Sequence, residues 1–131
     1  MKDLTGLTDE QWNKRFPNFP KSELACKCCG LLNINLLFLD KIQQDRTVAG
    51  IPFSINSGCR CEKHNTEEGG YPTSDHIASK EKQCEAVDIS CMSDRERFIM
   101  LDSLSSNIHH IGIDSKFIHA DNSKKTAVWL Y

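Results

Sequence analysis

The sequence predicts an α+β domain whose sheet is mainly antiparallel. Segments in which apolar and polar residues alternate are interleaved with two segments of helical spacing, and the connections between them are short. The chain has 131 residues, which suits a single domain over residues 1–131 with one hydrophobic core. Hydrophobic residues make up 39% of the chain and charged residues 26%, as in globular proteins.

The main core helix is expected over residues 33–50. Asn33 would cap its first turn, and Gly50 would end it. The apolar residues near helical spacing in this segment are Ile34, Leu37, Phe38, Ile42 and Val48. A second helix is expected to begin after Ser93, because Glu96 three residues later gives the pattern of a capping box. Its apolar residues are Phe98, Ile99, Leu101 and Leu104.

Alternating apolar and polar residues predict the strands. They are expected at 51–58, 85–90, 109–114, 117–121 and 126–131. Between the first two strands, residues 61–76 are expected to form a loop, since Gly69, Gly70 and Pro72 interrupt this stretch.

Charge and hydropathy exclude several classes of partner. A net charge of -2 gives no electrostatic reason to expect nucleic acid or an anionic membrane surface. No apolar run reaches the roughly 18 to 20 residues that cross a bilayer, and residues 1–12 lack the basic-then-apolar layout of a secretory signal. We therefore expect a protein that is made in the cytoplasm without a signal peptide of its own. A monomer is expected as well.

Seven cysteines are many for this chain, and an odd number cannot all pair with one another. In a reducing compartment this usage favours metal ligands or buried thiols over a disulfide framework. The clusters CKCC and CRC contain four cysteines that would suit a structural zinc, namely Cys26, Cys28, Cys59 and Cys61. Small buried thiols, or a disulfide that includes one of these residues or Cys29, are the alternatives.

Three polar residues form a candidate site for catalytic zinc, which needs three protein ligands and one open position for water. His76 at a loop end, Asp88 in one expected strand and His119 in a later strand would supply the ligands. Asp88 and His119 have apolar neighbours, and a cation would offset the cost of burying a carboxylate there. The alternative is that Asp88 is an exposed strand residue and His119 a hydrogen-bonded core histidine.

Four blocks of sequence, in order, resemble one enzyme family. They are SINSGCRCEKHNTEEGG, TSDH, CEAVDIS and GIDSKFIHAD, and the similarity runs over about residues 23–121. The blocks are similar to the zinc D-alanyl-D-alanine carboxypeptidases and L-alanyl-D-glutamate endopeptidases of the M15 peptidase family, subfamily A, whose hallmark is SxHxxGxAxD followed by a distal His. The phage endolysin-type members have the same order of blocks. The resemblance implies a hedgehog/DD-peptidase-like fold and hydrolysis of the peptidoglycan stem peptide.

The resemblance also implies roles for individual residues. The Zn²⁺ ligands that it implies are His76, Asp88 and His119. Arg60 matches the family arginine that binds substrate near the scissile carbonyl, for which a planar fork of donors is suited. Ser74 matches the motif serine, which could bind peptide backbone, and His64 recurs in a block where it would shape the substrate groove. Without the motif, Arg60 would be interpreted as a surface ion pair and Ser74 as a turn residue.

The spacing of the motif departs from the family pattern. Eleven residues separate His76 from Asp88, where the pattern SxHxxGxAxD has six, and Cys84 stands in place of the motif glycine. A loop insertion can leave both ligands in place at little thermodynamic cost. The loss of glycine is the more serious change, because glycine accepts backbone angles that cysteine resists.

The general base is the second departure. Several family members have an acidic residue three positions before the distal His, whereas this chain has Lys116. Asp114 and Asp121 are the candidates to replace it. Asp121 shares a strand face with His119, so we favour for it the role of orienting the ligand imidazole.

The leading prediction is a zinc metallopeptidase that cuts a D-Ala-D-Ala or L-Ala-D-Glu bond in the bacterial cell wall, as a phage lysis or virion-associated enzyme. The main alternative is a non-catalytic zinc-binding module of the same fold with a structural or interaction role, for which Lys116, Cys84 and the insertion argue. A weaker third hypothesis is a zinc site organised by the four clustered cysteines. A zinc stoichiometry of two would support that site as an additional one.

Overall fold

The main sheet has five strands in the spatial order β3-β4-β6-β5-β7. The structure, a computed structural model, describes residues 1–131. The strands are β3 (Ile55–Ser57), β4 (Ala86–Ser90), β5 (His110–Ile113), β6 (Phe117–Asp121) and β7 (Ala127–Leu130). Neighbouring strands are antiparallel except β5 and β7, which run parallel. The predicted α+β class and mainly antiparallel sheet are therefore confirmed.

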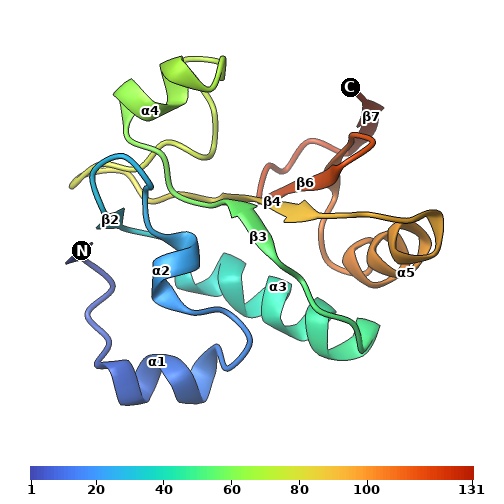
Figure 1. Ribbon diagram of the computed structural model, residues 1–131, viewed down its shortest axis with the longest axis horizontal. Helices are drawn as coiled ribbons and strands as arrows, with labels where there is room; N and C mark the ends of the chain where they lie inside the picture. The colour runs from blue at the N-terminus through green and yellow to red at the C-terminus, as the bar shows by residue number, and fades with distance from the viewer.

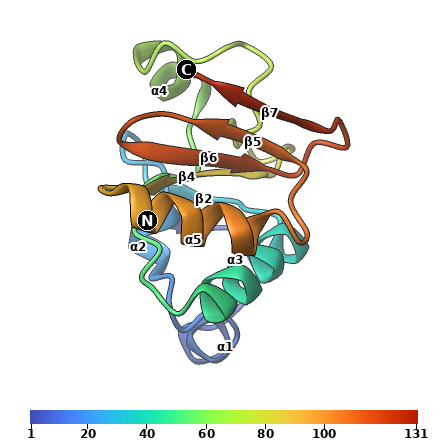
Figure 2. The same ribbon diagram turned by 90° about the vertical axis from the view of Figure 1, so that its right-hand side faces the viewer.

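Helices cover one side of this sheet. The two longest, α3 (Leu36–Ala49) and α5 (Asp94–Leu104), pack against each other, and Figure 2 shows them together below the strands. Helix α4 (Glu62–Glu67) and the C-terminus lie at the opposite end of that view. The N-terminal segment, blue in Figure 1, contains the remaining elements, which are β1 (Lys2–Asp3), α1 (Asp9–Arg15), α2 (Lys21–Leu24) and β2 (Leu31–Leu32). None of the helices is long and apolar enough to span a bilayer.

The main helix begins two residues later than predicted. Asn35, not Asn33, is its N-cap, and the Asn35 side chain accepts the backbone N–H three residues further on at 2.9 Å. Gly50 ends the helix with a left-handed φ of 68°, as expected. The predicted core face was wrong at Leu37 and Val48, which are 71% and 73% exposed, because at 3.6 residues per turn both fall away from the stripe that Phe38, Ile42 and Asp45 bury. The residues that this helix buries are Phe38, Leu39, Ile42 and Asp45.

The second helix begins where the sequence predicted. Ser93 Oγ accepts the backbone N–H of Glu96 at 3.1 Å, while the Glu96 carboxylate accepts from Met92 N at 3.4 Å rather than closing the box on Ser93. Phe98 is 72% exposed, so it does not belong to the core as predicted.

Residues 61–76 are not all loop. Helix α4 forms within them because Cys61 acts as its N-cap, with Cys61 Sγ accepting the backbone N–H of His64 at 3.4 Å. The strand expected at 51–58 is shorter than predicted and pairs only over Ile55–Ser57.

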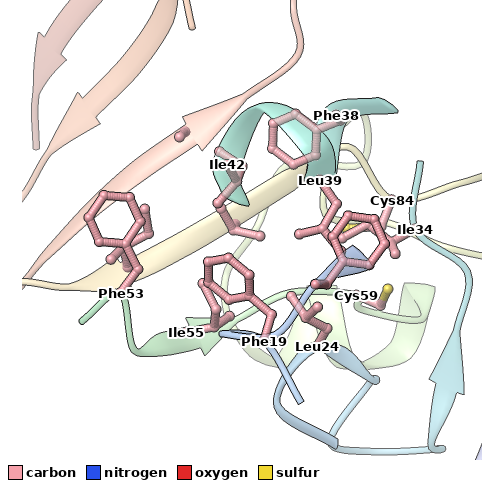
Figure 3. Packing of buried hydrophobic residues seen from close by; sticks show 14 of the residues in the cluster. Phe19, Leu24, Ile34, Phe38, Leu39, Ile42, Phe53, Ile55, Cys59 and Cys84 are labelled. Carbon is pink, nitrogen blue, oxygen red and sulfur yellow. The ribbon is translucent and has the colours of Figure 1, made fainter. Parts of the chain in front are cut away.

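The core lies between the sheet, α3 and the N-terminal segment. Figure 3 shows side chains from these elements meeting, among them Phe19, Phe38, Ile42 and Ile55. Along β4 and β6, alternate residues such as Ile89 point into this core, and the residues between them point to the other face of the sheet. Polar side chains on that second face are therefore held by rigid, hydrogen-bonded strands.

Candidate metal centre

A single row of residues crosses the face of the sheet opposite the core. Asp88 on β4 is paired with His119 on β6, His119 with Gly112 on β5, and Gly112 with Trp129 on β7. Residues opposite one another on paired strands have closely spaced Cβ atoms. The strand register therefore places a carboxylate, an imidazole and an indole side by side.

His76 reaches this row from a loop. Its backbone is tied to the Arg60 segment, where Arg60 N donates to His76 O at 2.8 Å. Its side-chain Nδ1 lies 2.8 Å from the carbonyl oxygen of Gly58, so Nδ1 carries the proton and donates. The other ring nitrogen, Nε2, is thereby left as a lone-pair donor and faces Asp88 Oδ1 at 3.2 Å.

The three predicted ligands converge. One ligand atom from each of His76, Asp88 and His119 lies within 4.8 Å of the others, and the residues are 3%, 7% and 9% exposed. His119 Nδ1 lies 2.9 Å from the same Asp88 oxygen that faces His76. Two imidazoles and one carboxylate in a buried cluster are the donor set that zinc takes in catalytic sites.

Asp121 orients His119. Its Oδ2 lies 2.7 Å from His119 Nε2 and 2.8 Å from His110 Nδ1, so it accepts from two imidazoles. With Nε2 occupied in this way, His119 has Nδ1 free to bind a metal. This is the orienting position that we favoured for Asp121 over that of a base.

The charges in this cluster favour the binding of a cation. Burial alone would raise the pKa of Asp88, but the neighbouring imidazoles of His119 and His76 hold it well below its usual range. Burial likewise lowers the pKa of His119, yet its bonds to Asp121 and Asp88 raise that pKa to about 9. A positive charge between the two carboxylates is therefore favoured, and a divalent ion would replace the imidazolium proton in that place. The residues present fit zinc.

Arg60 braces the other oxygen of Asp88. Its Nη2 donates to Asp88 Oδ2 at 3.1 Å and its Nε to Ser57 Oγ at 2.8 Å, and its side chain is 12% exposed. One carboxylate oxygen thus faces the two imidazoles while the other is fixed by a guanidinium. Arg60 is not the surface ion pair that its sequence context alone would suggest.

The cluster lies at the floor of a cleft with a volume of ≈ 580 Å³. Aromatic residues of the C-terminal segment form one wall, where the Trp129 ring lies 4.5 Å from the His110 ring and 5.6 Å from the His119 ring, between centroids. Gly112 makes room for this wall, because a Cβ at Gly112 would come within 2.7 Å of Trp129 and of Tyr131. The cleft has the size and mixed lining of a small-ligand or peptide site.

Of the other predicted site residues, Ser74 lines the cleft, and its Oγ accepts the backbone N–H of His76 at 3.2 Å. His64 lies on α4, where it is 3.7 Å from Glu68, and it does not line the cleft. Asp114 also lies outside the cleft, in the turn between β5 and β6, where its carboxylate accepts from Lys116 N at 2.9 Å. The prediction of Asp114 as a base gains no support from this position.

Among the cleft residues that were not predicted as site residues are Asp75, His110, Trp129 and Tyr131. Strand alternation was the sequence signal for two of them, since Trp129 and Tyr131 share a face of the last strand. Asp75 directly precedes a ligand. Burial raises its pKa, and the nearby negative charge of Asp121 raises it further.

Neither change in the motif disrupts the centre. Residues 79–83 form a turn, in which Ser79 N donates to Lys82 O at 2.9 Å and Asn33 Nδ2 donates to Ser79 O at 2.7 Å. The insertion therefore projects beside the site while His76 and Asp88 still meet. Cys84 has no positive φ, so the concern that this position requires glycine was unfounded.

A buried His-Asp-His cluster in a cleft is the ligand set found in one class of proteins, the zinc metallohydrolases. A family model described as Peptidase M15 matches residues 17–121, and the chain belongs to this family. M15 peptidases are in general zinc-dependent, so membership supports metallopeptidase activity and a peptidoglycan-type substrate. No curated protein matches the sequence.

Proposed function

We propose that the protein is a zinc-dependent peptidase that hydrolyses a peptide bond in the stem of bacterial peptidoglycan. The observation that carries the proposal is the convergence of His76, Asp88 and His119 within 4.8 Å at the floor of a cleft, in a chain of the peptidase M15 family. His76 would bind the ion through Nε2 and His119 through Nδ1, because hydrogen bonds to Gly58 and Asp121 occupy their other nitrogens.

Zinc at this centre would act as a Lewis acid on the scissile carbonyl and would lower the pKa of a bound water to about 7. Arg60 has two roles in this proposal. It holds Asp88 by one oxygen, and its remaining N–H donors border the cleft, where they would stabilise negative charge on the carbonyl oxygen. Ser74 would fix the His76 loop and bind the peptide backbone.

The general base is assigned to a carboxylate of the cleft. Asp75 and Asp121 border it, whereas Asp114 lies in a turn outside it. Asp121 is already engaged with two imidazoles, and Asp75 is half-buried with a raised pKa. Because Asp121 is engaged with two imidazoles, we place the role of base on Asp75 and the orienting role on Asp121.

The aromatic wall supports a peptide substrate. Trp129 and Tyr131 offer flat apolar surface beside the ligands, against which a short D-amino-acid side chain or stem-peptide backbone would pack. We propose a terminal D-Ala-D-Ala or an internal L-Ala-D-Glu bond as the scissile bond, and a phage lysis or virion-associated role. The cell wall would be the site of action.

A non-catalytic module of the same fold is the second candidate. Lys116 favours it, since it replaces the acid that several family members carry before the distal His, and it is exposed in the turn before β6. In that case the centre would bind zinc without turning over substrate.

Release of soluble stem peptides from purified bacterial walls separates the two candidates. We expect release that a chelator abolishes and added zinc restores, and loss of release to background in His119→Ala. The matched control is His109→Ala, because His109 is exposed and does not line the cleft. Bound zinc without release from any wall preparation would support the module instead.

A further inference from the structure

A second cluster of metal-ligand side chains lies outside the cleft. The Sγ atoms of Cys26, Cys29 and Cys61 lie within 4.8 Å of one another, and none of these residues lines the cleft. All seven cysteines are free thiols. Tetrahedral zinc with Zn–S bonds of about 2.3 Å separates its sulfurs by about 3.8 Å, so only a small contraction would bring the three thiols to a zinc ion.

Two of these cysteines form a knuckle in the chain. Cys26 and Cys29 have C-x-x-C spacing, followed by Gly30 at a φ of 77°, and Gly30 N donates to Cys26 O at 2.8 Å. A tight turn closed by a left-handed glycine brings both thiols to one side, as in structural zinc sites with this spacing. The set of four predicted from the sequence contained Cys59 in place of Cys29, although the C-x-x-C spacing was the signal for Cys29.

Backbone donors surround the sulfur of Cys26. Cys61 N donates to Cys26 Sγ at 3.4 Å. Burial raises the pKa of Cys26, yet the backbone N–H groups of Cys61, Cys29 and Cys28 lower it on balance. Backbone N–H groups aimed at one sulfur stabilise a thiolate, which is the form that binds a metal.

Cys28 is the available fourth ligand. It is exposed, and the nearby thiol of Cys61 raises its pKa. Cys59, which the sequence had suggested, lies instead in the hydrophobic core beside Cys84, as Figure 3 shows. The prediction of Cys59 as a ligand gains no support, because its buried side chain meets Cys84, whereas the thiol of Cys61 lies with those of Cys26 and Cys29.

We propose that Cys26, Cys28, Cys29 and Cys61 bind a second zinc ion with a structural role. The ion would join the turn between α2 and β2 to the start of α4, two segments that no strand pairing connects. Cys61 both caps α4 and follows Arg60, so the ion would also fix the segment that carries Arg60. The site is independent of the proposed peptidase activity.

The test is the metal content of the purified full chain. We expect about two zinc ions per wild-type chain, about one in His119→Ala and about one in Cys29→Ser. Cys91→Ala is the matched control, because Cys91 is buried far from the cluster in sequence and bonds to Ser93 O, and it should keep two ions. Cobalt-loaded His119→Ala should show a thiolate-to-cobalt charge-transfer band that is absent after Cys29→Ser.

If Cys29→Ser does not fold, the cobalt-loaded His119→Ala protein still tests the proposal. It retains all cysteines, so the charge-transfer band can be measured in a folded chain. Metal-free His119→Ala, or a disulfide within CKCC detected by alkylation without reductant, would overturn the proposal. If the wild-type chain binds two zinc ions but does not hydrolyse walls, the result counts against the proposed peptidase activity and not against the cysteine site.

Discussion

The two clusters of metal-ligand side chains are built on different supports. Asp88 and His119 lie on paired strands in fixed register, and Asp121, Gly58 and Arg60 hold the ligand side chains by hydrogen bonds. The cysteines lie on a turn and a helix start, with no strand among them. The comparison teaches that strand register alone brings the His-Asp-His side chains together, whereas in our proposal the cysteine cluster would gain much of its rigidity from its ion.

The largest expected effect is a difference between the two clusters: a change in the cysteine cluster should lower stability, and a change in the His-Asp-His cluster should lower activity. Cys29→Ser should lower the free energy of unfolding by about 3 kcal/mol or more, which is roughly 10 °C in Tm, because a structural ion contributes directly to folding. His76→Asn should abolish wall hydrolysis but lower the free energy of unfolding by only about 1–2 kcal/mol, since the Asn amide stands at the position of Nδ1 and can still donate to Gly58 O. Thermal denaturation and wall-release assays measure the two effects.

Equal losses of stability in these two variants would contradict the comparison. The Cys91→Ala control should stay within about 1–2 kcal/mol of wild type, since it removes one small buried thiol and no ligand.

The orienting role of Asp121 predicts the next effect. Asp121→Asn should weaken zinc binding or activity by about 10–100-fold, because the amide cannot hold two imidazole N–H groups as a carboxylate does. Zinc affinity measured by competition with a chelator provides the readout. Asp114→Asn, outside the cleft, is the matched control and should match wild type, and a similar loss in both variants would refute the assignment.

The aromatic wall predicts a smaller effect on substrate binding. Gly112→Ala places a Cβ within 2.7 Å of Trp129, so the indole must move away from the cleft. We expect KM to rise several-fold with little change in zinc content, together with a shift in tryptophan fluorescence. An unchanged KM would show that the wall does not contact substrate.

The smallest effect concerns a buried acid on α3. Asp45 is 1% exposed, and burial raises its pKa from 3.8 to about 7. The folded state therefore binds the proton more tightly than the unfolded state, so this group makes stability fall as pH rises from about 4 to about 7. Asp45→Asn should raise Tm by a few degrees at pH 8 and change it little at pH 5. Equal effects at both pH values would contradict the buried-acid account.

Strand alternation and the motif located the metal centre from sequence. Asp88 and His119 were placed on strands, and their neighbours Val87, Ile89 and Ile118 are buried as that placement requires. The period-2 pattern of a strand determines to which face of the sheet each side chain points. Ligands carried by a sheet must point to the same face, so this pattern was sufficient for Asp88 and His119. His76 could be placed only by resemblance, because a loop has no period.

Other features could not be predicted in advance. The start of α3 depends on which asparagine makes the capping bond, and Asn33 is drawn instead to Ser79 by the inserted turn. The aromatic wall depends on β7 pairing in parallel with β5, and no local pattern specifies that pairing. Contacts between residues far apart in the sequence therefore determine both the start of α3 and the position of β7.

The most direct test of the central claim is a crystal structure of the zinc-loaded protein with an anomalous difference map at the zinc edge. The account predicts a peak about 2.0–2.2 Å from His76 Nε2, His119 Nδ1 and one Asp88 oxygen. No peak at that position, or a zinc ion bound there without one of these three side chains, would contradict it.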